Sequence, residues 1–153
     1  MANAELIKNL NRALSLELAG VIQYMQHSFL VTGIEREVYR GFFRDQSEEA
    51  QDHALTLGDK IVALGGVPTV EPSMIRQATE LEAMLRQDLE LEREAMSAYL
   101  AAWESCGDQE RATRFQLEER IAEEQQHIEE LEKLTSERKA SVTNEKITLR
   151  QVS

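Results

Sequence analysis

The chain has 153 residues and one cysteine, and its 28 acidic and 17 basic side chains give it a formal net charge of −11. A chain of this length fits one domain, and its negative field repels nucleic acids and anionic lipids, so we expect neither as a partner. A single cysteine excludes an intrachain disulfide framework, and because the sequence shows neither a signal peptide nor an apolar run long enough to span a membrane, we expect a cytoplasmic protein.

The first half of the chain carries the pattern of two long helices. Residues 4–32 and 35–64 both place apolar side chains every three or four positions, the spacing that forms one stripe along a helix. Gly33 stands between them and predicts a tight turn. Helices joined by so short a turn pack antiparallel, so we expect a helical hairpin.

A longer connection follows over residues 65–80, where Pro68 and Pro72 exclude a continuous helix. Two more helices are predicted, one over about residues 79–105 and one that starts after Gly107 and runs to about residue 139. One long crossover between two hairpins is the order of an all-α, ferritin-like four-helix bundle, which we assign to residues 1–139. Residues 140–153 are polar and β-prone, and we expect a tail outside the bundle.

Ionisable side chains interrupt the apolar stripes of all four helices. They are Glu17 and Tyr24 in the first helix, His53 in the second, Glu92 in the third, and Glu124 and His127 in the fourth. These residues lie near the middle of their helices, so antiparallel packing would bring them to one level. Three unpaired carboxylates inside a bundle need compensation, and a bound cation supplies it. Carboxylates and neutral imidazoles suit iron, manganese or zinc.

Each of these residues also has a simpler interpretation. A glutamate can flank its stripe and face solvent, His53 can be a hydrogen-bonded core histidine, and Tyr24 can be a core residue whose hydroxyl bonds to a nearby carboxylate. Their joint match in depth favours a metal site. His27 lies off its stripe and is predicted at the surface or beside the site. The further acidic residues of the fourth helix are predicted as a solvated face.

Several segments together resemble bacterioferritin, within the ferritin-like superfamily. They are LNRALSLELAGVIQYMQH in the first helix, HALTLGDKIVALGGVP in the second, MLRQDLELE in the third and EEQQHIEELE in the fourth. The resemblance implies a di-iron ferroxidase centre. In that centre Glu17 and His53 would hold one iron, Glu92 and His127 the other, and Glu124 would bridge the two.

The sequence departs from the family pattern at two neighbouring positions. The second-helix Glu-x-x-His has Ala50 in the place of its glutamate, which removes one bridging carboxylate. Glu49 lies one position further from His53, and we expect it to join the metal ligands only if the helix is locally rotated or bulged. Gln51 stands where bacterioferritins carry the methionine that ligates haem, so we expect no methionine-ligated haem.

The leading functional hypothesis is iron storage or detoxification, with Fe(II) oxidised by dioxygen or peroxide. The alternative is a non-catalytic subunit that assembles with a complete homologue, and Ala50 is the residue that favours it. A manganese or mixed-metal oxidase on the same bundle is a third reading. We expect a homo-oligomer, at least a two-fold dimer, with a cage as the larger alternative, and the tail could serve as a docking tag.

Overall fold

A computed structural model describes residues 3–135 of the chain. The helices are α1 (Ala4–Leu30), α2 (Arg36–Ala63), α3 (Leu81–Glu104), a 3₁₀ turn (Asp108–Glu110) and α4 (Arg111–Leu134). The all-α, four-helix prediction is therefore confirmed. The fourth helix begins later than predicted, because the 3₁₀ turn precedes it. The predicted end of that helix and the tail lie outside the described residues.

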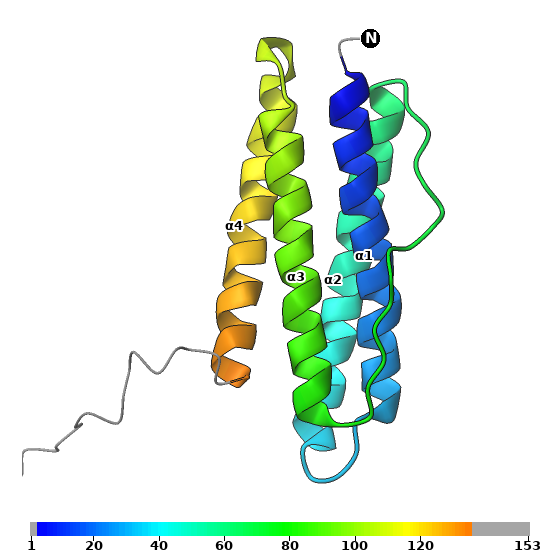
Figure 1. The fold of residues 1–153 in the computed structure, drawn as a ribbon, viewed down its shortest axis with the longest axis vertical. Coiled ribbons are helices and arrows are strands. Elements are labelled where there is room, and N and C mark those ends of the chain that lie inside the picture. Colours follow the sequence, from blue (N-terminus) through cyan, green and yellow to red (C-terminus); the bar gives the residue numbers. More distant parts are fainter. Residues whose placement is uncertain (1–2, 136–153) are drawn as a thin grey trace, which may run out of the picture.

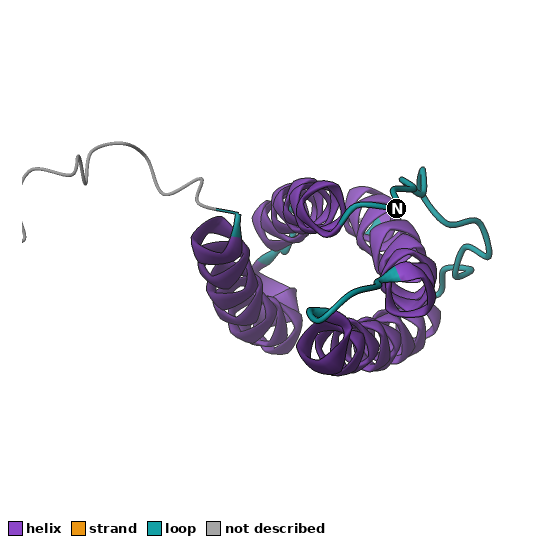
Figure 2. Cartoon of the chain, turned by 90° about the horizontal axis from the view of Figure 1, so that it is seen from below, coloured by secondary structure: helices purple, strands orange, loops and turns teal. Residues whose placement is uncertain are grey.

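The four helices surround a common axis (Figures 1 and 2). α1 and α2 form one antiparallel hairpin, α3 and α4 form the other, and the connection between the hairpins runs back along α1 (Figure 1). α1 packs closely on α2 and α3, whereas the backbones of α2 and α4 rarely approach each other. Within residues 3–135, no helix has the length and hydropathy needed to cross a membrane.

The turn between α1 and α2 has a specific local cause. Gly33 adopts a φ of 78°, a left-handed conformation that glycine reaches without steric cost. Nη1 of Arg36 donates to the carbonyl oxygens of Ser28, Phe29 and Val31 at 2.8–3.3 Å. These bonds satisfy carbonyls that the end of α1 leaves without helical partners.

The crossover is held against α1 by polar contacts. Asn11 donates to the carbonyl oxygen of Val67 and accepts a bond from the backbone N–H of Thr69. One turn further along α1, the backbone N–H of Ser73 donates to the carbonyl oxygen of Ser15 at 2.8 Å. This segment has no secondary structure of its own, so these bonds fix its path.

The apolar core is divided into two clusters. One cluster gathers the first half of α1, the second half of α2, the second half of α3 and the start of α4; it includes Leu10, Leu14, Leu57, Ile61, Leu91 and Leu117. The other gathers the opposite ends of the same helices and includes Phe43, Met84, Leu85, Leu89 and Leu131. Between them lies a polar layer, which we define as Glu17, His53, Glu92, Glu124 and His127.

Candidate metal centre

The structure brings all five residues of the polar layer to one place. Together with Gln46, Glu49 and Ala50 they line one small cavity inside the bundle. The side chains are deeply buried for ionisable groups: the exposed fraction is 1% for Glu124, 3% for His53, 6% for Glu17 and 7% for Glu92. Buried carboxylates at this density require either protons or a cation.

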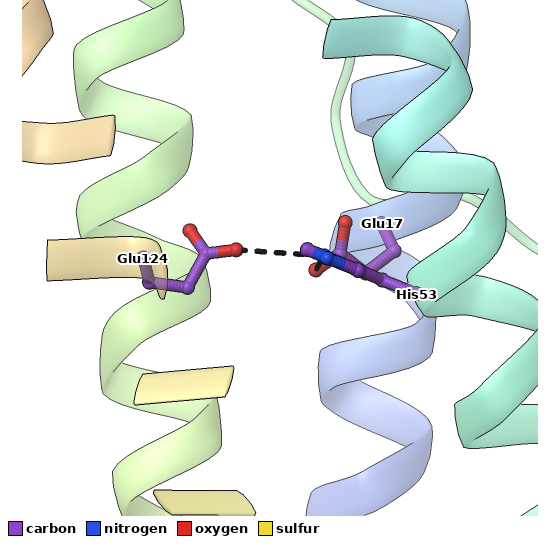
Figure 3. Close-up of side chains that lie close together, drawn as sticks. All are labelled: Glu17, His53 and Glu124. Carbon is purple, nitrogen blue, oxygen red and sulfur yellow. Dashed lines mark hydrogen bonds and ion pairs between the residues drawn. The ribbon is translucent and has the colours of Figure 1, made fainter. Parts of the chain in front are cut away.

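One half of the centre is formed by Glu17, His53 and Glu124, which come from α1, α2 and α4 (Figure 3). Nδ1 of His53 lies 3.2 Å from Oε1 of Glu17 and 3.7 Å from Oε1 of Glu124. The two carboxylates thus share the Nδ1 edge of the ring, and one ligand atom from each residue lies within 4.8 Å of the others. Three such atoms could contact a single ion.

The other half is formed by Glu92, Glu124 and His127, which come from α3 and α4. Glu124 belongs to both halves, so its carboxylate occupies the position that a ligand bridging two ions would need. Oε2 of Glu124 and Nδ1 of His127 are buried and have no hydrogen-bond partner among the described residues. Buried polar atoms are normally paired, so these two are available as metal ligands.

Two tyrosines support the centre in a symmetric arrangement. The hydroxyl of Tyr24 on α1 donates to Oε1 of Glu92 on α3 at 2.5 Å, and the hydroxyl of Tyr99 on α3 donates to Oε1 of Glu17 on α1 at 2.6 Å. Each tyrosine follows its own helix's glutamate by seven residues. The carboxylate partner suggested for Tyr24 from the sequence is found, whereas the bond from Tyr99 to Glu17 was not predicted.

Burial raises the pKa of two carboxyl groups of the centre, Glu17 and Glu124. Burial, followed by the negative charge of Glu92, raises the pKa of Glu124 far above its ordinary 4.5. Burial also raises the pKa of Glu17, against the opposing effect of His53. For His53, burial lowers the pKa, but contact with Glu17 outweighs it and the net pKa is raised. A cation entering the centre would act in the opposite sense and lower these pKa values, because it stabilises the ionised carboxylates.

Glu49 reaches the centre without the helix distortion that the sequence analysis required. α2 is a continuous α-helix through this region, so no bulge is needed to bring the Glu49 carboxylate beside the two histidines, and its role as a metal ligand stays a prediction. Oε1 of Glu49 lies 3.1 Å from Nε2 of His127 and 3.7 Å from Nε2 of His53. Its side chain approaches from the more open side of the layer, where it is 36% exposed. The backbones of α2 and α4 are not in close contact, which leaves room between the two helices for the Glu49 side chain. This flexible side chain is long enough to reach His127 on α4.

Ala50 stands at the position where a glutamate could have reached the centre from α2. A Cβ atom placed on Gly20 of α1 would lie 3.4 Å from Cβ of Ala50, so the two helices approach closely at this point. Ala50 is 6% exposed and offers no ligand atom. The carboxylate that α2 presents to the two histidines is therefore that of Glu49.

His27 was predicted at the surface or beside the site, and the first of these alternatives is wrong. It is fully buried, and its Nδ1 lies 3.0 Å from Oδ1 of Asp88, which is also fully buried. Nε2 of Gln23 donates to the same carboxylate at 2.9 Å, and Gln23 Oε1 accepts a bond from the backbone N–H of Arg76 in the crossover. The spacing in the sequence could have predicted this pair. Asp88 precedes Glu92 by one helical turn and His27 follows Tyr24 by three residues, so both lie on the faces of their helices that carry the centre.

Glu123 also differs from expectation. It was assigned to a solvated acidic face, yet its Oε2 lies 3.1 Å from Nε2 of His53 and its side chain is 42% exposed. Sequence spacing could not identify this contact, because Glu123 and Glu124 are adjacent and point in different directions from α4.

Comparisons with known proteins agree with the ferritin-like fold. A profile for the ferritin-like domain matches residues 7–140. A nutrient stress-induced DNA-binding protein from Synechococcus is 34% identical over 128 residues, covering 75% of this chain and 72% of that protein. A bacterioferritin from Brucella melitensis is 33% identical over 134 residues, covering 84% and 81%. A ferritin-like di-iron carboxylate protein from Bacillus anthracis superposes with a TM-score of 0.84 at 34% identity, covering 88% and 98%.

Proposed function

Because this chain belongs to the family of ferritin-like domains, we propose that its polar layer binds a pair of iron ions and oxidises Fe(II) for storage or detoxification. The observation that carries the proposal is the pair of His and carboxylate groups that share Glu124. Carboxylates and imidazoles suit iron in such bundles. A shared carboxylate places two ions side by side, as a two-electron oxidation requires.

Each residue has a defined part in this proposal. Glu17 and Nδ1 of His53 hold one Fe(II), while Glu92 and His127 hold the other. Glu124 contacts both. Each Fe(II) gives up one electron, so two ions reduce one dioxygen to hydrogen peroxide with the uptake of two protons. Peroxide is the alternative oxidant, and it takes two electrons and two protons to give two waters.

Glu49 is the carboxylate of α2 nearest to the position that Ala50 leaves without a ligand. Its carboxylate faces both histidines, at 3.1 Å from His127 and 3.7 Å from His53. It approaches the ring nitrogens on the outer side of the layer, whereas a glutamate at position 50 would approach from within. We therefore expect a working centre that is slower than one with a complete Glu-x-x-His pair.

The decisive measurement is iron-dependent oxygen uptake together with bound iron per chain. The wild-type chain should bind close to two irons, and Glu124→Ala should abolish uptake because it removes the ligand that both halves share. Glu119→Gln, an exposed change on the same helix, is the matched control. Unchanged uptake in Glu124→Ala would refute the proposal. Near-zero iron in the wild-type chain would instead support the non-catalytic subunit, which Ala50 favours.

We also propose that a second copy of the chain covers an apolar face of α1 and α2. The exposed side chains there include Ile22, Met25, Phe29, Leu55 and Val62, at 39–61% exposure. Contiguous apolar surface of this kind usually marks an interaction site. A sedimentation experiment tests the proposal: Leu55→Glu should reduce the assembly size, and an unchanged size would refute it.

We also predict that the protein binds neither haem nor DNA. Gln51 is exposed on the same face and offers no thioether sulfur, so we expect no haem absorption band after reconstitution. The Synechococcus relative is named a DNA-binding protein, but a net charge of −11 opposes binding to a polyanion. A gel-shift assay at low salt should therefore detect no complex.

A further inference from the structure

A second cavity lies between α2 and α4, at the end of the bundle where α4 begins. Its floor is formed by Leu10 of α1, Leu57 of α2 and Leu117 of α4, which are 1%, 5% and 4% exposed. The backbones of α2 and α4 rarely approach each other, so long polar side chains cover these leucines. The cavity shares no lining residue with the cavity of the polar layer.

The rim of this second cavity carries two cationic side chains, although the chain has a net charge of −11. They are Lys60 in the last turn of α2 and Arg120 on α4, and both are half-buried. Within residues 3–135, the ammonium of Lys60 has neither a hydrogen-bond acceptor nor an ion-pair partner. Arg120 donates through Nη1 to Oε2 of Glu123 at 2.7 Å, which leaves the other N–H groups of its guanidinium for a ligand.

The charges of the rim favour a single negative charge. Glu119 is the only carboxylate among the residues that line the cavity, and it is exposed, so water and salt screen its effect. Two positive charges therefore stand against one negative charge. Glu119 opposes an anion and takes no part in holding one.

The size of the cavity restricts the ligand further. Its volume of about 160 Å³ is close to that of an engineered cavity of about 150 Å³ that holds benzene. A pocket for a drug-sized molecule has at least about 300 Å³. Phosphate or sulfate would satisfy the two cations but would leave the three leucines without a partner, and a long acyl chain would not fit.

We propose that this cavity binds a small aliphatic monocarboxylate. Its short apolar body contacts Leu10, Leu57 and Leu117, and its carboxylate accepts hydrogen bonds from Lys60 and Arg120. The planar guanidinium matches the geometry of a carboxylate, and the ammonium adds a compact charge. The inference does not rest on the proposed function, since it involves no residue of the polar layer.

The test is a titration of the chelator-treated, full-length chain with isovalerate, followed through the methyl resonances of carbon-13-labelled leucine. Isovalerate is slightly larger than benzene, and so few atoms should give a dissociation constant on the order of 1 mM. The methyl signals of Leu57 and Leu117 should shift. Sulfate has the charge without the apolar body, and isoamylamine has the body with the opposite charge. Both should bind about tenfold more weakly or less.

Variants of the rim locate the binding site. Lys60→Gln should weaken isovalerate binding about tenfold, the loss expected of one charged hydrogen bond. Lys133→Gln removes the same charge in the last turn of α4, where Lys133 pairs with Glu130, and should bind like the wild type. Arg120→Lys keeps the charge but not the planar fork, so it should weaken binding less than Arg120→Gln does. Octanoate, whose chain is too long for the cavity, should bind no more tightly than isovalerate.

Each contrary result has a distinct meaning. The absence of a saturable shift with isovalerate, or equal affinities of Lys60→Gln and Lys133→Gln, would overturn the inference. Equal binding of isoamylamine would show that the cations do not select the ligand, and equal binding of sulfate would show that the leucines do not. Tighter binding of octanoate would contradict the argument from size. All these measurements use metal-free protein, so failure of this inference and failure of the proposed iron centre are separate results.

Discussion

Replacing Glu124 by glutamine should stabilise the metal-free protein while abolishing metal binding. Glu124 is 1% exposed, and burial with the nearby charge of Glu92 raises its pKa far above 4.5. The folded metal-free chain therefore keeps this proton at neutral pH, whereas the unfolded chain releases it. Glutamine has nearly the same shape as a protonated glutamate and can donate to Glu92 without titrating.

The size of the effect follows from proton linkage. A carboxyl whose folded-state pKa is raised stabilises the fold fully only below its unfolded pKa, and that contribution is lost as the pH rises. Between pH 4.5 and pH 7 the loss is about 1.4 kcal/mol per pH unit, or about 3 kcal/mol in total. Glu124→Gln avoids this loss, so its metal-free melting temperature should be about 6–12 °C above wild type at pH 7.

Urea and thermal unfolding of chelator-treated protein at pH 4.5 and pH 7 provide the assay. The wild type and Glu124→Gln should have similar stability at pH 4.5 and diverge at pH 7. Added Co(II) should stabilise the wild type but not Glu124→Gln. Glu119→Gln should remain within about 0.5 kcal/mol of the wild type at both pH values. A less stable Glu124→Gln at pH 7, or a gap of equal size at both pH values, would show that the reasoning is wrong.

Ala50→Glu should speed iron-dependent oxygen uptake by adding a bridging carboxylate, and should lower the metal-free urea midpoint by adding a buried charge; a slower rate would contradict the role assigned to this position. Tyr99→Phe removes the bond to Glu17 and should cost about 1–2 kcal/mol of unfolding free energy, with weaker Co(II) binding by titration; unchanged affinity would show that the hydroxyl does not position the ligand. His27→Ala leaves the buried Asp88 carboxylate with the bond from Gln23 but without its histidine, and should cost about 3–5 kcal/mol in urea unfolding; a loss below 1 kcal/mol would imply that Asp88 is protonated and needs no histidine.

The helices and the level of the polar layer could be predicted because they depend on the local sequence pattern. Apolar residues at helical spacing define which face of each helix is buried, whatever the partner helix is. A glutamate or histidine within that stripe must then be buried at a known height. This reasoning brought Glu17, His53, Glu92 and Glu124 to one layer, where the structure also has them.

Contacts that depend on how the helices face one another were not predictable in the same way. Whether Glu49 reaches His127 depends on the separation of α2 and α4. The apolar stripe of a single helix does not determine that separation. Tyr99 meets Glu17 only because α1 and α3 are antiparallel in one particular register.

The sequence by itself determined that this chain forms a four-helix bundle with ionisable groups at mid-height, since helical periodicity is a property of neighbouring residues. Only the tertiary structure decided that His27 is buried against Asp88 and that His53 presents one nitrogen to the centre and the other to Glu123. The physical reason is that a side chain's partners are set by the rotation and spacing of separate helices, and long polar side chains reach across that spacing in ways a stripe does not record.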